Sequence, residues 1–195
     1  MKKKLYIYLV VVLLFIGLFI EKGCITKKVY NENVRDYLVY SVNSMPQDLL
    51  LLDDNNIRKK DLQIALFDGL VSMDEKGKIV PSLASSWSVS KDKLSYTFKI
   101  REDARWSNGD KIVPQDFVEF FSRILKEKDN TYAHELQCIF GVKEYLEGKK
   151  SFQQVAINPG KDNTLEIRLN YPCDDFIKIL SEPVFTLKRN FYNLK

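Results

Sequence analysis

The chain has 195 residues, of which 45% are hydrophobic and 29% charged, with eight glycines and six prolines. This composition is typical of a globular domain, and together with the absence of an internal repeat it excludes a disordered chain and a solenoid. The formal net charge is +4, but residues 1–23 hold four lysines against one glutamate, so the remainder carries only +1. Basic and acidic residues alternate there, so the charge does not favour a nucleic-acid-binding surface.

The first 23 residues have the order of an export signal. Three lysines precede an uninterrupted apolar run over residues 5–20, which as a helix would be about 24 Å long, shorter than the roughly 30 Å hydrocarbon core of a membrane. Gly23 followed by Cys24 predicts cleavage before Cys24 and a lipid on its thiol, while an uncleaved anchor and simple secretion remain open. We expect a protein outside the cytoplasm, attached to the outer face of the cytoplasmic membrane by a tether at residues 24–36.

The first folded elements are expected to be a strand and a helix. Tyr37–Val42 are β-branched and aromatic and predict a buried strand. Four apolar residues then recur at helical spacing, and Gly69 lies where that helix would end. They are Leu62, Ala65, Leu66 and Leu70. A turn at residues 74–77 comes next, and Pro81 predicts the start of a short helical turn through Ala84.

The middle of the chain has the clearest periodicity. Residues 94–100 alternate between apolar and polar side chains, as in a half-buried antiparallel strand, and Trp87 begins the strand before it. Residues 106–110 contain Asn-Gly and predict a tight turn. Pro114 is expected at the first position of a helix with one apolar stripe. The stripe consists of Phe117, Phe120, Phe121, Ile124 and Leu125.

The last third of the chain alternates between short helices and strands. The predicted elements are a helix within residues 132–146, a turn at 158–163, a strand over 165–169, a short helix through Leu180 and a strand at 184–187. Asp174 can cap the short helix, and Pro183 can stop it. Because helices and strands are mixed and joined mostly by hairpin-like turns, we expect an α+β (mixed α/β) fold rather than a doubly wound sheet.

Little in the sequence favours catalysis. His134 is the only histidine, and no serine or cysteine near it suggests a dyad. The carboxylate pairs at 53–54 and 174–175 lack calcium-loop spacing and are explained by caps or solvated turns. We therefore expect no enzyme activity, no catalytic residue, no metal and no cofactor. Cys138 and Cys173 are either two small buried residues or a disulfide of an exported protein.

Five motifs follow one another in a specific order. They are LFDGL at 66–70, PSLA at 81–84 with Trp87 behind it, YTFKIR at 96–101, WSNGD at 106–110 and DFV at 116–118. In order and spacing they resemble the family 5 extracellular solute-binding proteins, which are the oligopeptide- and dipeptide-binding receptors of ATP-driven importers. The likeness covers most of residues 37–195.

The resemblance implies a partial type II periplasmic-binding-protein-like fold. Family members are more than twice this length and enclose a peptide between two lobes, with its backbone paired as an added strand. On that plan residues 37–67 form the first segment of the hinge-side lobe, residues 68–190 form an accessory domain, and residues 191–195 begin a return to that lobe. The chain is then an amino-terminal fragment without the opposing lobe, which supplies the acidic group for the peptide's amino terminus.

The resemblance also implies ligand-binding residues. Asn55, Asn56 and Ile57 fall where family members pair with the peptide backbone, and Tyr132 falls where an aromatic residue borders the pocket. Asn55 stands where the family usually has an acidic residue. The implied function is peptide capture for an importer, with impaired binding, and the implied partners are a peptide, the permease subunits and the membrane. The alternative is a membrane-attached interaction module that contacts the transporter or another surface protein without binding peptide.

Overall fold

Helix α2 (Ile57–Leu66) opens the part of the chain that the computed structural model describes, residues 57–126 and 131–189. The chain divides into two units, and all the described residues belong to the second, residues 43–195. The expected export signal, the tether with Cys24 and the strand at 37–42 lie outside the described residues, as do Asn55 and Asn56.

Helix α2 ends three residues before the expected stop at Gly69. The chain after Leu66 hydrogen-bonds to distant segments and does not continue the helix. The carbonyl of Asp68 accepts the N–H of Leu187 at 2.7 Å, and the carbonyl of Gly69 accepts the N–H of Leu83 at 2.9 Å. The expected apolar face is also partly wrong. Leu66 is 59% exposed, whereas the polar Gln63 is buried.

The turn at residues 74–77 is confirmed. It joins β1 (Val71–Met73) to β2 (Ile79–Pro81) in an antiparallel pair. The Asp74 carboxylate accepts the backbone N–H groups of Lys76 and Lys78 at 2.9 and 2.8 Å, and so fixes the turn from within.

The helical turn expected from Pro81 to Ala84 is wrong. Pro81 instead closes β2 opposite Val71, and Ala84 is already the first residue of the next strand. The Ala84 N–H donates to the carbonyl of Leu70 at 3.0 Å. Pairing with a distant segment therefore replaces the local turn that the proline suggested.

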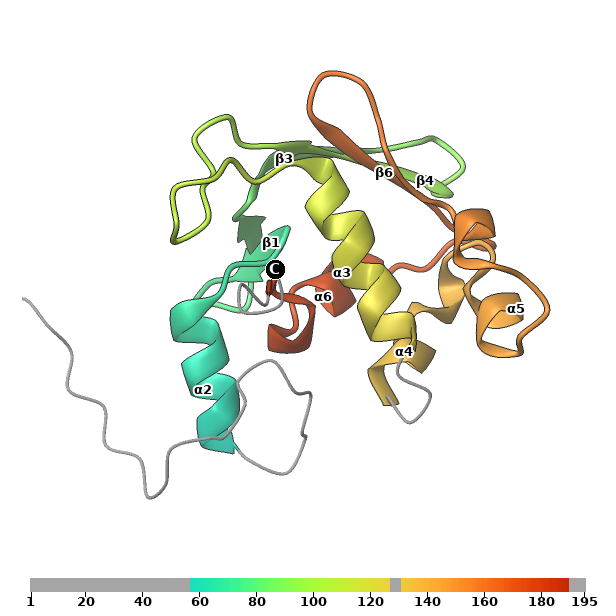
Figure 1. The fold of residues 1–195 in the computed structure, drawn as a ribbon, viewed down its shortest axis with the longest axis horizontal. Helices are drawn as coiled ribbons and strands as arrows, with labels where there is room; N and C mark the ends of the chain where they lie inside the picture. Colours follow the sequence, from blue (N-terminus) through green and yellow to red (C-terminus); the bar gives the residue numbers. More distant parts are fainter. Residues whose placement is uncertain (1–56, 127–130, 190–195) are drawn as a thin grey trace, which may run out of the picture. The chain divides into compact units, whose positions relative to one another are not determined.

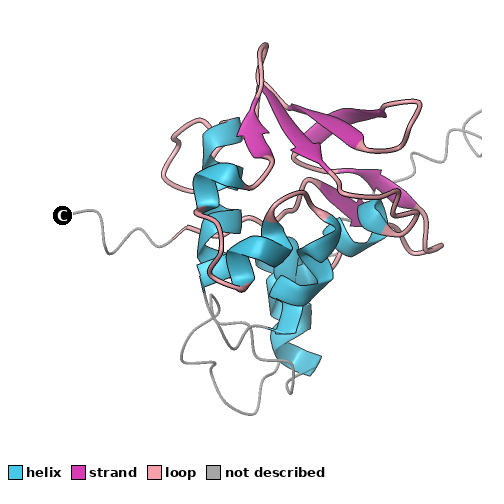
Figure 2. Ribbon diagram, turned by 90° about the vertical axis from the view of Figure 1, so that its right-hand side faces the viewer, coloured by secondary structure: helices cyan, strands magenta, loops and turns pink. Residues whose placement is uncertain are grey.

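The main sheet has four antiparallel strands in the order β3-β4-β6-β5. Their bounds are β3 (Ala84–Val89), β4 (Ser95–Ile100), β5 (Ile157–Pro159) and β6 (Thr164–Arg168). Strand β5 was not expected, since the sequence predicted a turn from residue 158. The helices lie to one side of these strands, as Figure 2 shows.

The alternation predicted for residues 94–100 is confirmed. Tyr96, Phe98 and Ile100 are buried, while the residues between them face the other side of the sheet. Leu165 and Ile167 of β6 stand opposite Phe98 and Tyr96 and are equally buried. One face of the sheet is therefore apolar and covered, and the other is lined by hydroxyl, amide and charged side chains.

Helix α3 (Pro114–Lys126) covers the apolar face and lies beside the strands in Figure 1. Pro114 occupies its first position as expected, and all five residues of the predicted stripe are buried. The core that α3 shares with the sheet also takes in residues from the later helices. None of the helices in the described ranges 57–126 and 131–189 is long and apolar enough to cross a membrane.

The single helix expected within residues 132–146 is broken. The structure has α4 (Thr131–Glu135), the 3-10 helix η1 (Leu136–Cys138) and α5 (Val142–Leu146) in its place. The chain leaves helical geometry because Ile139 forms a bridge with Leu169 and the Phe140 N–H donates to Arg168. Gly141, with φ +86°, then turns the chain into α5.

The last elements correct two expectations. They are η2 (Phe152–Gln154), α6 (Phe176–Leu180) and η3 (Pro183–Phe185). Asp174 does not cap α6, because its carboxylate pairs with Lys93 at 2.8 Å. The strand expected at 184–187 does not form. Residues 183–185 are the 3-10 helix η3, and the Thr186 hydroxyl after it donates to the Pro183 carbonyl at 2.6 Å.

Candidate functional site

The 3-10 helix η3 contacts both the ring of Tyr132 and α2, the helix that begins with Ile57. Ile57 is the first residue of α2, and α2 packs against η3. The Tyr132 ring, from α4, stands edge-on to the Phe185 ring of η3, with centroids 6.4 Å apart and planes at 82°. The structure thus brings Tyr132 and the helix of Ile57 to one place, which we call the η3 junction (residues 183–188).

Lys188 fastens the η3 junction from inside. Its side chain is buried, and the ammonium donates to the carbonyls of Pro183 and Val184 at 3.2 and 3.3 Å. It also lies 5.7 Å from the centroid of the Phe67 ring, just beyond the end of α2. Because a buried ammonium is costly without such partners, Lys188 ties η3 to the end of α2. An isolated lysine has no sequence pattern, and sequence reasoning missed this residue.

Two further hydrogen bonds connect the η3 junction to α3 and to the segment after α2. The Arg123 guanidinium, on α3, donates to the carbonyl of Lys188. The N–H of Leu187 donates to Asp68. The position of Phe185, and of the Tyr132 ring beside it, is therefore fixed by α3 as well as by the segment that follows α2.

Two of the sequence motifs meet at the start of α3. Asp116 accepts hydrogen bonds from the Val113 N–H at 2.8 Å and from the Trp106 indole at 3.4 Å. Arg189 lies 3.9 Å from the same carboxylate, and its guanidinium is 5.7 Å from the Trp106 ring. The tight turn at 106–110 is confirmed, with the Gly109 N–H donating to Trp106 at 2.8 Å. These motifs brace the helix and have no reactive arrangement.

A groove of about 700 Å³ runs between α3, the edge strand β5 and residues 188–189. Its walls carry charges of both signs, from Glu119 and Arg123 of α3 and from Arg189, together with the apolar side chain of Ile157. A smaller hollow of about 390 Å³ lies over the polar face of the sheet. There Phe140 is 38% exposed, and the cations of Lys150 and Arg168 lie 4.8 and 5.4 Å from its ring centroid.

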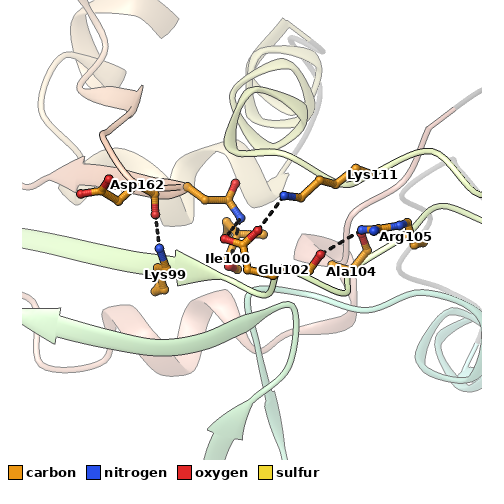
Figure 3. A network of polar contacts seen from close by, with 8 residues as sticks. Lys99, Ile100, Glu102, Ala104, Arg105, Lys111 and Asp162 are labelled. Atoms are coloured by element: carbon orange, nitrogen blue, oxygen red, sulfur yellow. Dashed lines mark hydrogen bonds and ion pairs between the residues drawn. The ribbon is translucent and has the colours of Figure 1, made fainter.

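A network of polar contacts lies at the end of β4 and is shown in Figure 3. Lys111 donates to the Glu102 carboxylate at 2.6 Å, and this hydrogen bond lowers the pKa of Glu102. Asn163 donates to the Ile100 carbonyl at 3.1 Å, and Lys99 donates to the carbonyl of Asp162. The charged groups are exposed and paired, so the network orders two loops and leaves no group poised for catalysis.

Neither His134 nor the second acidic pair forms a reactive centre. His134 is exposed and shares a 2.6 Å hydrogen bond with Gln137. Within the described residues, no group of three or more His, Cys, Asp or Glu side chains could hold a metal ion. What the geometry provides is a scaffold that positions aromatic and backbone groups around η3.

The model of the bacterial extracellular solute-binding proteins, family 5 (Middle), matches residues 78–193, and the chain belongs to this family. The dipeptide-binding protein of Lactococcus lactis subsp. cremoris is 33% identical over 146 residues, which are 73% of this chain and 26% of that protein. The periplasmic oligopeptide-binding protein OppA of Escherichia coli is 39% identical over 121 residues, 60% of this chain and 22% of that protein.

The fold agrees with this assignment. The structure of Listeria monocytogenes OppA bound to peptide matches with a TM-score of 0.64 at 28% identity, over 73% of this chain and 28% of that chain. The mixed fold and the partial type II periplasmic-binding-protein-like architecture are therefore confirmed. The chain spans about a quarter of the length of these relatives. The family is one of solute-binding proteins rather than enzymes.

Proposed function

We propose that the chain is part of the peptide-capturing component of an ATP-driven importer. The observation that carries this proposal is the family match over residues 78–193, which includes four of the five motifs in full and Trp87. The relatives are named for binding dipeptides or oligopeptides, and a matching structure holds a peptide. The protein would act outside the cytoplasm, deliver peptide to the permease subunits, and be held at the membrane by a lipid on Cys24.

The ligand would meet the chain near the η3 junction. Asn55, Asn56 and Ile57 would pair with the peptide backbone, and Tyr132 would border a side-chain pocket. Two contacts support this arrangement, since α2 packs on η3 and Tyr132 packs on Phe185. Main-chain pairing of this kind tolerates many peptide sequences.

We further propose that the 195 residues alone bind peptide weakly, with a Kd above the order of 1 mM. Affinity in a two-lobed receptor comes largely from burying the ligand between the lobes, and the chain spans about a quarter of its relatives. Calorimetric titration of the purified chain with a panel of short peptides tests this. Saturation in the micromolar range would contradict it.

A chimera tests peptide capture itself. The chain replaces the matching region of the Lactococcus dipeptide-binding protein, and peptide binding is measured by calorimetry. We expect micromolar binding, and a loss of about tenfold, or about 1.4 kcal/mol, in Tyr132→Ala. Tyr171→Ala is the matched control, because Tyr171 is 55% exposed and lies on a turn after β6. A folded chimera that binds no peptide would contradict the proposal.

The groove between α3 and β5 supports the alternative function of an interaction module. It places an edge strand beside charges of both signs, which suits an extended segment of another protein. Purification of the chain with a permease subunit, with no peptide bound, would favour this function. Arg123 is unsuitable for this test, since it also holds Lys188, so Glu119→Lys is the appropriate variant.

A further inference from the structure

Two cysteines lie where η1 meets the turn after β6. The carbonyl of Cys138 accepts the N–H of Asn170 at 2.8 Å, and the next residue, Ile139, forms an antiparallel bridge with Leu169. This pairing draws the turn that carries Cys173 against η1, close enough for Cys173 to contribute to the raised pKa of the Cys138 thiol, whose main cause is burial. Both cysteines are in the thiol form in this structure.

The two cysteines differ in their exposure. Cys138 is buried, and its thiol lies 4.0 Å from the Glu135 carbonyl oxygen, to which it donates. Burial raises the pKa of the Cys138 thiol to about 12, and Cys173 adds to this effect. The Tyr96 ring packs edge-on to Phe176 with centroids 4.8 Å apart. Burial raises the pKa of Tyr96, and Cys173 and Cys138 add to this effect. Cys173 is only half-buried, so it is the thiol that a reagent can reach.

We propose that Cys138 and Cys173 form a disulfide when the protein meets an oxidising environment. The expected oxidation in the cell rests on the proposed function, which places the protein outside the cytoplasm, where thiol pairs are oxidised. The oxidant is a disulfide, either of a small molecule or of an oxidoreductase. Cys173, after losing its proton, attacks one oxidant sulfur and expels the other as a thiol. Cys138 then loses its proton and attacks Cys173, releasing the second thiol, so two protein thiols are oxidised and one disulfide is reduced.

The disulfide would brace the path from the sheet to the η3 junction. Residues 138–173 become a closed loop that contains β5 and β6, and the turn after β6 is locked onto η1. That turn leads directly into α6 and then η3, where Phe185 meets Tyr132. Because closure of a loop of this size restricts the unfolded chain, we expect oxidation to raise Tm by roughly 5 to 10 °C.

Oxidation of the purified chain tests the pair directly. The full chain with Cys24→Ser, which leaves two cysteines, is incubated with oxidised and reduced glutathione and then alkylated. We expect both thiols to resist alkylation, the intact mass to fall by two hydrogen atoms, and a proteolytic digest to contain the two cysteine peptides joined. The melting temperature should rise on oxidation, whereas Cys138→Ala and Cys173→Ala in the same background should show no rise.

Two results would overturn the proposal. One is that both cysteines remain alkylatable, or that Cys173 keeps a glutathione that Cys138 never displaces. This result concerns the geometry alone and is independent of peptide binding or location. The other is that unmodified chain recovered from outside the cytoplasm, alkylated at once, carries both thiols free. The oxidised-versus-reduced comparison needs no substitution of either cysteine, so it holds even if a single variant fails to fold.

Discussion

Asp116 is a single carboxylate that supports the start of α3 through three neighbours. It accepts from the Val113 N–H, which precedes the helix, and from the Trp106 indole, and it faces Arg189. The bond to Val113 satisfies one of the N–H groups that every helix start leaves unpaired. The motifs at 106–110 and 116–118 are thus joined into one structural unit at the start of α3.

We expect Asp116→Ala to lower the free energy of unfolding by about 1 to 2 kcal/mol, because it removes the helix-start bond and leaves the indole N–H with a poorer partner. Urea unfolding followed by circular dichroism measures this. Asp103→Ala is the control, since its exposed pair with Arg101 should contribute nothing measurable. Equal stability of the Asp116 variant and the wild type would show that the cap is unimportant.

The turn between η1 and α5 requires a glycine at position 141. Its φ is +86°, and an added Cβ would lie 2.5 Å from the carbonyl oxygen of Gln154. We expect Gly141→Ala to cost roughly 2 to 4 kcal/mol, from backbone strain together with the clash. Gly148 has φ +73° with open space around it, so Gly148→Ala should cost only about 1 kcal/mol. If thermal unfolding shows equal losses of stability in the two variants, backbone strain alone accounts for the cost and the clash at Gly141 contributes nothing.

Among the elements, α3 joins the sheet to the later helices of the described unit. One side of the helix is buried along its whole length against the sheet, and the other side forms a wall of the groove. We expect Phe117→Ala to lower the free energy of unfolding by about 3 to 5 kcal/mol, because Phe117 is 1% exposed. Glu119→Ala, on the opposite side, should stay within about 0.5 kcal/mol. Denaturant unfolding of both variants gives the comparison, and similar losses would contradict the packing.

The elements that the sequence predicted well are those whose signal is local. Alternation over β4, Asn-Gly before the turn at 106–110, and the stripe of α3 depend only on neighbours in sequence. The elements that it missed are decided by distant partners. Ile139 leaves the helix because Leu169 pairs with it, β5 forms against β6, and Leu187 donates its N–H to Asp68.

The same distinction holds for the candidate site. Tyr132 could be named through the family resemblance, because that resemblance carries information about a shared fold. Its contact with Phe185 could not, since the two residues are joined only by packing. Lys188 had no signal at all, because a buried and a solvated lysine look alike in sequence. The roles of Asn55, Asn56, Ile57 and Tyr132 in binding peptide stay predictions.

At the scale of the whole molecule, one continuous core links the sheet, α3, α6 and η3. We therefore expect the described unit to unfold in a single cooperative transition. Both tryptophans, Trp87 and Trp106, lie within it, so intrinsic fluorescence, far-ultraviolet circular dichroism and alkylation of the buried Cys138 thiol should give the same midpoint in urea. Separate midpoints would show that the η3 region and the sheet unfold independently.

The sheet order also has a consequence for how the chain is made. β4 pairs with β6, and residues 101–163 lie between them in sequence. A ribosome adds roughly 5 to 20 residues per second, so several seconds pass between the emergence of the two strands. During that interval the β3–β4 hairpin has an unpaired edge and an uncovered apolar face. The sheet is completed only when β6 has been made. Until then, a chaperone or a translocation channel can bind the nascent chain.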